Sequence, residues 1–483
     1  MACLSLAGCT FLTNGGIDKV LSNDAVADAG ARNPVSIESV RARDSQAKFG
    51  AKQHPKILAR YGGAYENESL ELVLALIVGR LVEQSKNKDR AFDITILNSP
   101  TVNAFALPGG YLYVTRGLLA LANDGAEVAA VLAHEMAHVS SNHGLDRSRK
   151  ARAVDIANRV ASDVVSNPVV SRVARASTEQ RLAAFSKAQE LQADAVGIKM
   201  LGEAGFDPYA ASRMLIAMTR HSAWRTASKL GNEDEMSNSH PSTPQRVELA
   251  RRHARAFGPQ GSGDRMQDRY LRGLNGILFG DAEKEGFIRG RTYLHKKLGF
   301  RFAVPDGFEL ANRARAVLAS GPGETAIRFD AVSKKDNGAT PQAYVRSGWV
   351  NGLDESSVVP VSVNGLPAAQ AVARSGDWQF RVTVVELKGR YYRFIVAAPR
   401  STTGLDQIST QVSGSFRQLK ASELSKLKPL KMKVVKLRRA SSVQKMTEEM
   451  VGVARPKQLF LTLNGMARER GLRSGELVKI VTD

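Results

Sequence analysis

Three features of the sequence predict an α+β protein, in which a mainly helical domain with a small sheet is followed by smaller units. The stretch Ala126–His143 is rich in alanine and contains neither Gly nor Pro, which indicates a buried helix. The run Ala91–Asn98 alternates and contains β-branched residues, which is typical of a strand. From about Gly290 the sequence changes to short alternating runs, which favour a β-rich region.

The length of 483 residues predicts about three domains. We expect a tether over residues 1–50 and a mainly helical domain over residues 51–258. A small α/β or β-rich interaction domain should cover residues 285–420, and a strand–helix–helix–strand module residues 428–483. No internal repeat is present.

The expected elements follow from local patterns. In the helical domain the predicted helices are Glu68–Lys86, Leu118–Ala122, Ala126–His143, Lys187–Gly202, Tyr209–His221 and Pro244–Arg255. The predicted strands there are Ala91–Asn98, Asn103–Leu107 and Tyr111–Val114, with a turn at Pro108–Gly110 between the last two. In the β-rich domain they are Phe300–Val304, Ala326–Val332, Val358–Val363, Trp378–Leu387 and Tyr391–Ala397, closed by a helix over Leu405–Phe416.

Composition narrows the choice of partners. The net charge of +21 indicates an anionic neighbour, such as a membrane surface or a cell-wall polymer. No nucleic-acid-binding motif accompanies this charge, so we expect no nucleic-acid partner. The most apolar run, Leu70–Val82, is interrupted by Glu71 and Arg80, so we expect a core helix there and no membrane span.

The N-terminus carries a possible anchor. Both cysteines, Cys3 and Cys9, lie in the first nine residues, so the folded body should have no disulfides. The run Leu6–Cys9 looks like a bacterial lipobox, in which Cys9 would be lipidated, but the segment before it is too short for a signal peptide. We therefore expect a start upstream of Met1 and a periplasmic protein anchored to the outer membrane through Cys9. The alternative is an accidental small-residue tetrapeptide before a disordered arm.

The strongest chemical signal is the pattern His-Glu-x-x-His inside the alanine-rich helix. His134 and His138 are four residues apart, which places them about 40° apart around the helix axis, so both imidazoles project from one face. That spacing suits two ligands of one zinc ion, and Glu135 lies between them, where it could take a proton from a bound water. The alternative is a chance match on an ordinary helix, because the pattern fixes only three positions.

A catalytic zinc needs a third protein ligand, and the run Glu190–Asp194 offers one. A glutamate on a second helix, Glu190, can reach the metal, and Asp194 lies one turn further along. From there it could hold a ligating histidine by its far N–H. The alternative is a solvated pair of carboxylates on a helix face.

Together with neighbouring stretches, these motifs resemble a family of zinc metallopeptidases, metallopeptidase family 48, which includes HtpX, CAAX prenyl protease and BepA-like enzymes. The resembling stretches are, in order, Asn103–Gly110, Val114–Leu119, His134–His138, Glu190–Asp194, and Ser239–Pro241 with Arg246. The resemblance covers about Arg60–Arg255. It implies a zincin-type domain with one Zn²⁺ per chain, which His134, His138 and Glu190 bind and beside which Glu135 is the catalytic base. Members of the family that span the membrane have hydrophobic helices that this sequence lacks, so the resemblance is to the soluble or lipid-anchored periplasmic branch.

Further site residues follow from the same motifs. The strand that begins Asn103, Ala104, Phe105 could pair with a substrate as an extra strand, although plain sheet packing is an alternative and Phe105 could be a core residue. In the family's motif, His240 could be a fourth zinc ligand that closes a resting site, or a donor to the oxyanion; a surface histidine is the alternative. Arg246 could pair with a carboxylate near the site.

The C-terminal segment resembles a degenerate LysM module. Leu459–Gly465 and Leu472–Ile480 match its second half, whereas Arg438–Ser441 stands where Gly-Asp-Thr is usual. The resemblance leaves open whether this module binds glycan or is purely structural.

The sequence therefore predicts a zinc-dependent metalloendopeptidase of a bacterial envelope that hydrolyses misfolded or misassembled envelope proteins. The alternative is a chaperone-like or peptidoglycan-associated binding protein that keeps the protease fold with little turnover.

Overall fold

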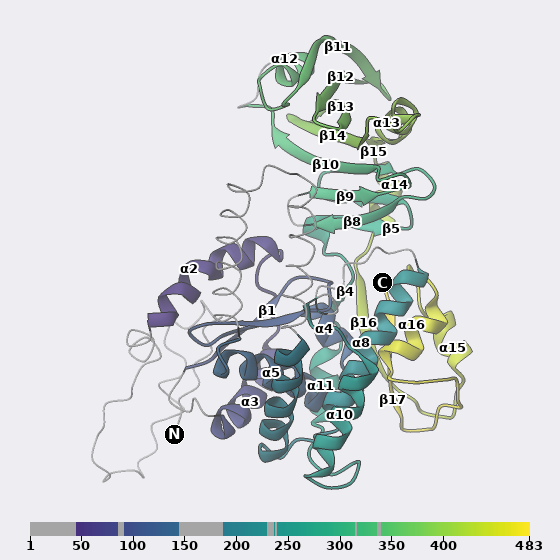
Figure 1. Ribbon diagram of the computed structural model, residues 1–483. Coiled ribbons are helices and arrows are strands. Elements are labelled where there is room, and N and C mark those ends of the chain that lie inside the picture. The colour runs from purple at the N-terminus through teal and green to yellow at the C-terminus, as the bar shows by residue number, and fades with distance from the viewer. Residues whose placement is uncertain are drawn as a thin grey trace, which may run out of the picture.

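The structure is a computed structural model and describes residues 45–85, 91–143, 187–228, 236, 239–313, 316–335 and 340–483. Figure 1 shows helices around a small sheet in the lower part and a β-rich part above them. The described residues have the predicted α+β class. Cys9 and the expected tether lie outside the described residues, apart from the end of the tether, which is helical from Ser45.

A three-stranded sheet forms the centre of the helical part. Its strands, in spatial order, are β1 (Asp93–Leu97), β3 (Tyr111–Thr115) and β2 (Ala104–Leu107). β1 runs parallel to β3, whereas β2 is antiparallel to it and is an edge strand in the described part of the chain. The turn before β3 requires Gly110 for two reasons. Its φ of +81° is strained for any residue with a side chain, and a Cβ atom at this position would lie 1.9 Å from the carbonyl oxygen of Ala91.

Different helices cover the two faces of this sheet. α2 (Ser45–Arg60) packs on the face that carries Phe105 and Tyr113. α3 (Glu68–Gln84) and α5 (Gly125–Ser140) pack on the opposite face, whose residues belong to the main hydrophobic core. The edge strand β2 therefore lies directly against the helix that carries the His-Glu-x-x-His pattern.

The other helices of this part are α4 (Arg116–Leu121), a helix over residues 187–203, α8 (Ala210–Ala227), α10 (Pro244–Arg255) and α11 (Gln267–Leu274). They differ from the predicted helices mainly at their ends. α8 continues past His221 to Ala227, and α5 stops at Ser140, so that His143 follows the helix instead of belonging to it. In the segment between α8 and α10, Met236 and Ser239 are helical.

The β-rich part contains two sheets. The larger is antiparallel, in the order β11-β12-β13-β14-β10-β9-β8. Its strands are β8 (Glu309–Arg313), β9 (Ala316–Ser320), β10 (Ala326–Ser333), β11 (Leu353–Val363), β12 (Leu366–Ser375), β13 (Trp378–Leu387) and β14 (Arg390–Pro399). The smaller has the order β15-β7-β6-β5, with β5 (Phe287–Arg289), β6 (Thr292–His295), β7 (Phe300–Ala303) and β15 (Arg417–Gln418).

Short helices complete this part: η1 (Glu283–Glu285), α12 (Pro341–Val345), α13 (Leu405–Gly414) and α14 (Ala421–Lys426). Aromatic side chains from both sheets, such as Phe302 and Phe394, form a core of their own. A second core lies under α12, where Tyr344 stacks on Tyr391. The β-rich part therefore has hydrophobic cores that are separate from the core of the helical part.

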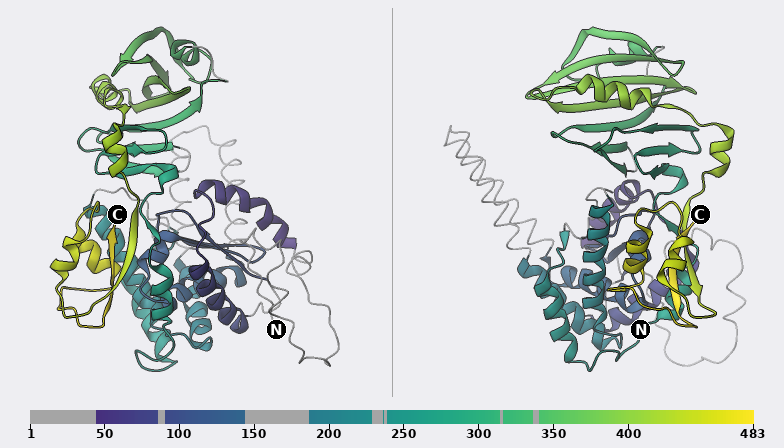
Figure 2. Two further views of the ribbon diagram at one scale, coloured as in Figure 1. Left: turned by 180° about the vertical axis from the view of Figure 1, so that it is seen from behind. Right: turned by 90° about the vertical axis from the view of Figure 1, so that its right-hand side faces the viewer.

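The C-terminal segment has the predicted strand–helix–helix–strand order, formed by β16 (Leu430–Lys436), α15 (Val443–Glu448), α16 (Pro456–Leu463) and β17 (Leu477–Thr482). Its apolar residues belong to the same core as the helices of the helical part. Figure 2 shows the segment, in yellow, beside those helices in both views. β16 also pairs with β4 (Leu278–Phe279), the strand that follows α11.

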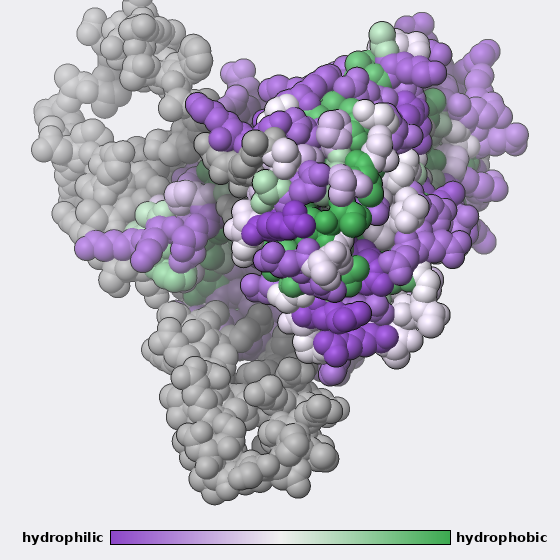
Figure 3. Space-filling view, turned by 90° about the horizontal axis from the view of Figure 1, so that it is seen from above, coloured by the Kyte–Doolittle hydropathy of each residue, from purple (hydrophilic) through white to green (hydrophobic). Residues whose placement is uncertain are grey.

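One face of the β-rich part exposes apolar side chains. Seen from above, hydrophobic residues gather in the middle of a mostly hydrophilic surface (Figure 3). The large hydrophobic residues exposed in the β-rich part include Leu318, Val359 and Trp378. None of the helices in the described ranges combines the length and apolar character needed to cross a membrane.

Candidate metal centre

Helix α5 positions three of the predicted site residues. Asp124 caps its N-terminus by accepting a hydrogen bond from the backbone N–H of Glu127 at 2.8 Å, which satisfies a free donor of the first turn. The helix is buried from Gly125 to Ala137. His134 and His138 consequently project from one face of a helix that the surrounding core holds in place.

The helix over residues 187–203 brings a carboxylate to these imidazoles. It packs closely on α5 at Gly197, where a Cβ atom would lie 3.0 Å from the backbone nitrogen of His134. Glu190 and Asp194 precede Gly197 at helical spacing and lie on the same side. A glycine at this contact therefore allows both carboxylates to reach His134.

Four side chains converge at this contact: His134, His138, Glu190 and His240. One donor atom from each lies within 4.8 Å of the other three. His134 Nε2 lies 3.0 Å from His138 Nε2 and 3.3 Å from His240 Nδ1. The Glu190 oxygens lie 3.3 Å from the Nε2 atoms of His134 and His138, and 2.8 and 3.0 Å from His240 Nδ1.

This group fits one metal ion. Ligand atoms bound tetrahedrally at zinc distances lie about 3.3 Å from one another, close to the separations observed here. Two imidazole nitrogens that face each other repel unless a cation or a proton lies between them. The donor set of three imidazoles and one carboxylate could therefore hold a metal ion.

Glu135 lies beside this group with an oxygen that is buried and unbonded. The side chain is 4 % exposed, and its Oε1 accepts no hydrogen bond from the residues described. His240 Nε2 lies 3.7 Å from Glu135 Oε1. A buried carboxylate oxygen without a partner is costly, so this geometry favours a role for Glu135 in accepting a proton.

Asp194 and Arg246 bind to the side of this cluster that faces away from the converging donor atoms. Asp194 Oδ1 lies 3.0 Å from His134 Nδ1, on the side of the ring that faces away from the four donors. Arg246 donates to both oxygens of Asp194 at 2.7 Å, and its Nη1 lies 3.0 Å from Glu190 Oε2. The same Nη1 donates to the carbonyl oxygen of Pro241, next to His240. One guanidinium therefore fixes the second helix and the His240 segment together.

The electrostatics of the group favour a cation. Burial alone would lower the pKa of His134, but the carboxylates of Asp194 and Glu190 raise it to about 9. Burial opposes ionisation of Glu190, yet contacts with His134, His138 and His240 lower its pKa far below the usual range. Burial lowers the pKa of His138. Glu190 therefore stays anionic among the imidazoles, which attracts positive charge.

His240 reaches the group from the segment before α10. The backbone N–H of His240 donates to the carbonyl oxygen of Met236 at 2.7 Å, and the N–H of Met236 donates to that of Val102 at 3.3 Å. Val102 lies just before the edge strand β2, so the His240 segment borders the start of the predicted substrate strand. Asn103 and Ala104 are buried there, and Phe105 stacks on Tyr113.

His143 is a contact that sequence reasoning missed. Its Nδ1 lies 3.0 Å from His138 Nδ1 and its Nε2 lies 3.2 Å from Gln192 Oε1. Asn142, with φ of 55°, turns the chain after α5 and returns His143 to the side of His138. An asparagine just after a helix favours such a turn, and this is the signal that could have located the contact.

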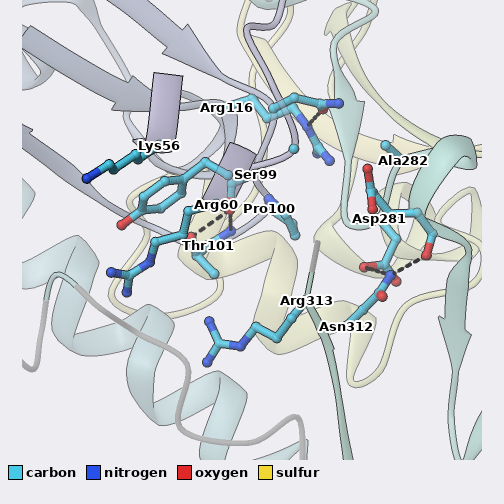
Figure 4. Close-up of a pocket in the computed structure, with 14 residues that line it drawn as sticks. Lys56, Arg60, Ser99, Pro100, Thr101, Arg116, Asp281, Ala282, Asn312 and Arg313 are labelled. Atoms are coloured by element: carbon cyan, nitrogen blue, oxygen red, sulfur yellow. Dashed lines mark hydrogen bonds between the residues drawn. The ribbon is translucent and has the colours of Figure 1, made fainter. Parts of the chain in front are cut away.

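A separate cavity of about 500 Å³ lies between α2, residues 98–101 and residues of the β-rich part, including Asp281 and Asn312 (Figure 4). Arg116 lines it, donating from Nε to Asn98 Oδ1 at 2.8 Å and from Nη1 to the carbonyl oxygen of Leu278 at 3.0 Å. Burial lowers the pKa of Arg116 to about 10. The cavity shares no residue with the four converging side chains.

Comparison with known proteins identifies the same part of the chain. Residues 68–254 match the sequence profile of the family described as Peptidase family M48. The chain is similar to "Mitochondrial metalloendopeptidase OMA1" of Schizosaccharomyces pombe, with 26% identity over 207 residues, which are 42% of this chain and 59% of the relative. It is also similar to "Beta-barrel assembly-enhancing protease" of Yersinia pestis, with 27% identity over 195 residues, 37% of this chain and 38% of the relative.

A third relative is "Mitochondrial metalloendopeptidase OMA1" of Arabidopsis thaliana, with 30% identity over 161 residues, 33% of this chain and 31% of the relative. The matched region spans less than two thirds of each of these three relatives. The profile ends at residue 254, so it includes the four converging side chains but neither the β-rich part nor the C-terminal segment.

Proposed function

Because residues 68–254 are a peptidase family M48 domain, we propose that the protein is a zinc-dependent metalloendopeptidase that hydrolyses peptide bonds of unfolded proteins. The observation that carries the proposal is the convergence of His134, His138, Glu190 and His240 beside Glu135, whose Oε1 has no hydrogen-bond partner among the described residues. In this proposal His134, His138 and Glu190 hold one zinc ion. Zinc is the metal that best suits imidazole and carboxylate donors at this spacing on a helix.

The roles of the chain's own residues follow from their positions. A bound zinc would acidify a water molecule and polarise the scissile carbonyl. Glu135 takes the proton of the attacking water through Oε1 and passes it to the leaving amine. Asp194 fixes the ring of His134, and Arg246 forms ion pairs with both Asp194 and Glu190. No further acid is needed, because one carboxylate performs both proton transfers.

The edge strand β2 is the proposed substrate platform. Among the described residues β2 is an edge strand, and it contacts α5, so a substrate chain that paired with Ala104–Leu107 would lie near His134 and Glu135. Pairing of this kind uses backbone groups of the substrate and therefore requires an extended, unfolded segment. We accordingly propose loose sequence specificity and substrates among misfolded or misassembled envelope proteins, in keeping with the β-barrel assembly named for the Yersinia pestis relative.

We also propose a periplasmic location with a lipid anchor at Cys9. The support is the run Leu6–Cys9 and the net charge of +21, which suits an anionic membrane surface or peptidoglycan. Expressed in a bacterium behind an added signal peptide, the protein should incorporate labelled palmitate and sediment with membranes. Cys9→Ala should release it, and an unlabelled, freely soluble wild-type protein would reject the anchor.

The test of the enzymatic proposal is chelator-sensitive cleavage of an unfolded protein such as casein. Purified protein should contain about one zinc per chain and lose cleavage when the zinc is removed, with recovery on its return. Glu135→Gln should keep the zinc and lower turnover by about 10²-fold to 10⁴-fold, because it removes the base and leaves the donors in place. Glu203→Gln, an exposed change on the Glu190 helix, is the matched control and should cleave normally.

Two outcomes would contradict the proposal. Cleavage by Glu135→Gln at the wild-type rate would exclude this residue as the base. A wild-type protein that binds zinc and unfolded chains but cleaves none would instead support the binding, chaperone-like alternative.

A further inference from the structure

His143 and Gln192 form a bridge between the two helices that carry the metal-binding side chains. His143 is 4 % exposed and follows α5, whereas Gln192 lies on the helix over residues 187–203, two residues after Glu190. The rings of His143 and His138 meet nearly edge to face, at 76° and with centroids 4.9 Å apart. The resulting chain of contacts runs from His138 Nδ1 to His143 Nδ1 at 3.0 Å and from His143 Nε2 to Gln192 Oε1 at 3.2 Å.

We propose that His143 is a positioning residue that fixes the tautomer and ring orientation of His138 through this bridge to Gln192. The inference rests on the proposed function, because it takes His138 to be a metal ligand. A nitrogen that donates its lone pair to a metal carries no proton, and His138 points Nε2 at the other donors, 3.0 Å from His134 Nε2. The proton of a neutral His138 must therefore be on Nδ1.

The proton on His138 Nδ1 determines the positions of the other protons in the bridge. His138 Nδ1–H donates to His143 Nδ1, which must then be the unprotonated nitrogen of that ring. His143 consequently carries its own proton on Nε2 and donates it to Gln192 Oε1. Every contact in this order pairs one donor with one acceptor. The reverse order would place a proton on His138 Nε2 and block its lone pair, so the bridge selects the metal-binding tautomer.

The Nδ1 atoms of the two histidines of α5 therefore contact different partners. His134 Nδ1 faces Asp194, a carboxylate that Arg246 neutralises. His138 Nδ1 faces the imidazole of His143, which in turn contacts the amide of Gln192. The group already contains the carboxylates of Glu135, Glu190 and Asp194, and Arg246 pairs with the last two. A bridge without a carboxylate orients His138 without adding another buried negative charge, which would need its own partner.

A purely structural role for His143 makes a different prediction, and two substitutions separate the roles. His143→Phe keeps the volume of the ring and removes both polar atoms. His143→Gln fills the space less well but keeps an acceptor for His138 and a donor for Gln192. If His143 only packs, the Phe variant should resemble the wild type more closely than the Gln variant. If it orients His138, the order should be reversed.

The measurement is the zinc dissociation constant of the full chain, by competition with a chromogenic chelator, and the visible spectrum of the Co²⁺-loaded protein. His143→Phe should weaken zinc binding by about 10-fold to 100-fold and alter the Co²⁺ spectrum, as loss of a supporting hydrogen bond does at other metal sites. His143→Gln should bind zinc within about tenfold of the wild type. His253→Phe, a histidine of α10 distant from this bridge in sequence, is the matched control and should leave both readouts unchanged.

Gln192→Leu keeps the test decisive if the His143 variants fail to fold. Gln192 is exposed, so this change should not disturb the fold, and it removes the last acceptor of the bridge. We expect zinc binding weakened by about threefold to tenfold, less than for His143→Phe, because water can replace the amide. Wild-type zinc affinity in a folded His143→Phe variant would overturn the positioning role and leave the proposed function intact. If His143→Phe does not fold, wild-type zinc affinity in Gln192→Leu would overturn it. A wild-type protein that binds zinc without cleaving would contradict the proposed function but not the positioning role, because zinc affinity tests the bridge independently of turnover.

Discussion

His240 contacts other donors and the proposed base at the same time. Its Nδ1 lies 2.8 Å from Glu190 Oε1 and 3.3 Å from His134 Nε2, while its Nε2 lies 3.7 Å from Glu135 Oε1. As a fourth ligand it would occupy the position that the attacking water needs. The resting site would then be closed, and the segment that carries His240 would have to move before a substrate could enter.

We predict that His240→Ala raises the rate of proteolysis and leaves most of the zinc in place, because three donors remain. An oxyanion donor at this position predicts the opposite sign, a loss of about 10²-fold or more in turnover. One assay of casein cleavage, with the zinc content measured alongside, decides between the two. Unchanged cleavage and zinc content would exclude both roles.

At the residue scale, local geometry determines which site residues the sequence could reveal. His134 and His138 lie on one helix face whatever the tertiary structure, so their spacing predicts the pair. His143 lies five residues beyond His138, which on a continuous helix is about 140° away around the axis and off the ligand face. The helix instead ends at Ser140 and Asn142 reverses the chain, so the contact depends on a boundary that periodicity does not fix.

At the scale of elements, the contact between α5 and the helix over residues 187–203 depends on one glycine. A side chain at Gly197 would meet backbone atoms of Ala133 and His134 at 3.0–3.1 Å. These atoms belong to a buried helix and have little freedom to move. Any larger residue must therefore push the two helices apart and displace Glu190 from the imidazoles.

We predict that Gly197→Val lowers the free energy of unfolding by about 1–3 kcal/mol, as overpacking does in other cores. It should also weaken zinc binding by about tenfold or more, because the displaced helix carries both Glu190 and Asp194. Urea unfolding and chelator competition measure the two effects. The matched control is Lys199→Val, an exposed position on the same helix, which should cost only about 0.5–1 kcal/mol and leave zinc binding unchanged. Wild-type zinc affinity in Gly197→Val would mean that the helices tolerate separation.

Elements were predictable where the pattern was strong. Trp378–Leu387 alternates β-branched and aromatic residues, and β13 has the predicted bounds. β12 was missed, because Leu366–Ser375 is rich in alanine, which has a low preference for strands. Ala369 and Ala371 are buried between β11 and β13, where small residues fit under α12. That environment comes from tertiary packing, which a single strand's sequence does not contain.

At the scale of the whole molecule, the C-terminal segment packs as an extension of the helical part. Trp224 Nε1 of α8 donates to the carbonyl oxygen of Ala454 at 3.0 Å, and Arg455 Nε donates to that of Ala227 at 2.9 Å. Apolar residues of β16, β17 and α16 share the core of α3 and α5. The periodicity of this segment predicted its helices and strands but not the surface that they cover, because a pattern identifies an apolar face without identifying its partner.

Lys479 of β17 forms a buried polar contact between the C-terminal segment and the helical part. It is 1 % exposed, and its Nζ donates to the carbonyl oxygens of Ala120, Leu121 and Ala122 at 2.9, 3.1 and 2.6 Å. These carbonyls end α4 and have no partner within the helix, so the Lys479 amino group supplies hydrogen-bond donors that they otherwise lack. Lys479→Met should therefore destabilise the protein by about 2–4 kcal/mol, because it leaves several buried acceptors unbonded. The exposed Lys433→Met on the neighbouring strand should change stability by no more than about 0.5 kcal/mol.

The same lysine predicts how stability depends on pH. Burial lowers the pKa of Lys479 to about 7, although Glu127 and Asp124 act to raise it. In the unfolded chain a lysine titrates near pH ~10.4, so between about pH 7 and pH 10 the unfolded state holds a proton that the folded state has lost. Stability rises with pH wherever the unfolded state binds more protons, at up to about 1.4 kcal/mol per pH unit for one proton. The unfolding free energy of the wild type, minus that of Lys479→Met, should therefore increase from pH 7 to pH 9 in urea unfolding followed by tryptophan fluorescence. A difference that stays constant or falls over this range would mean that the buried ammonium keeps its proton and that the carbonyls of α4 hold it in the charged form.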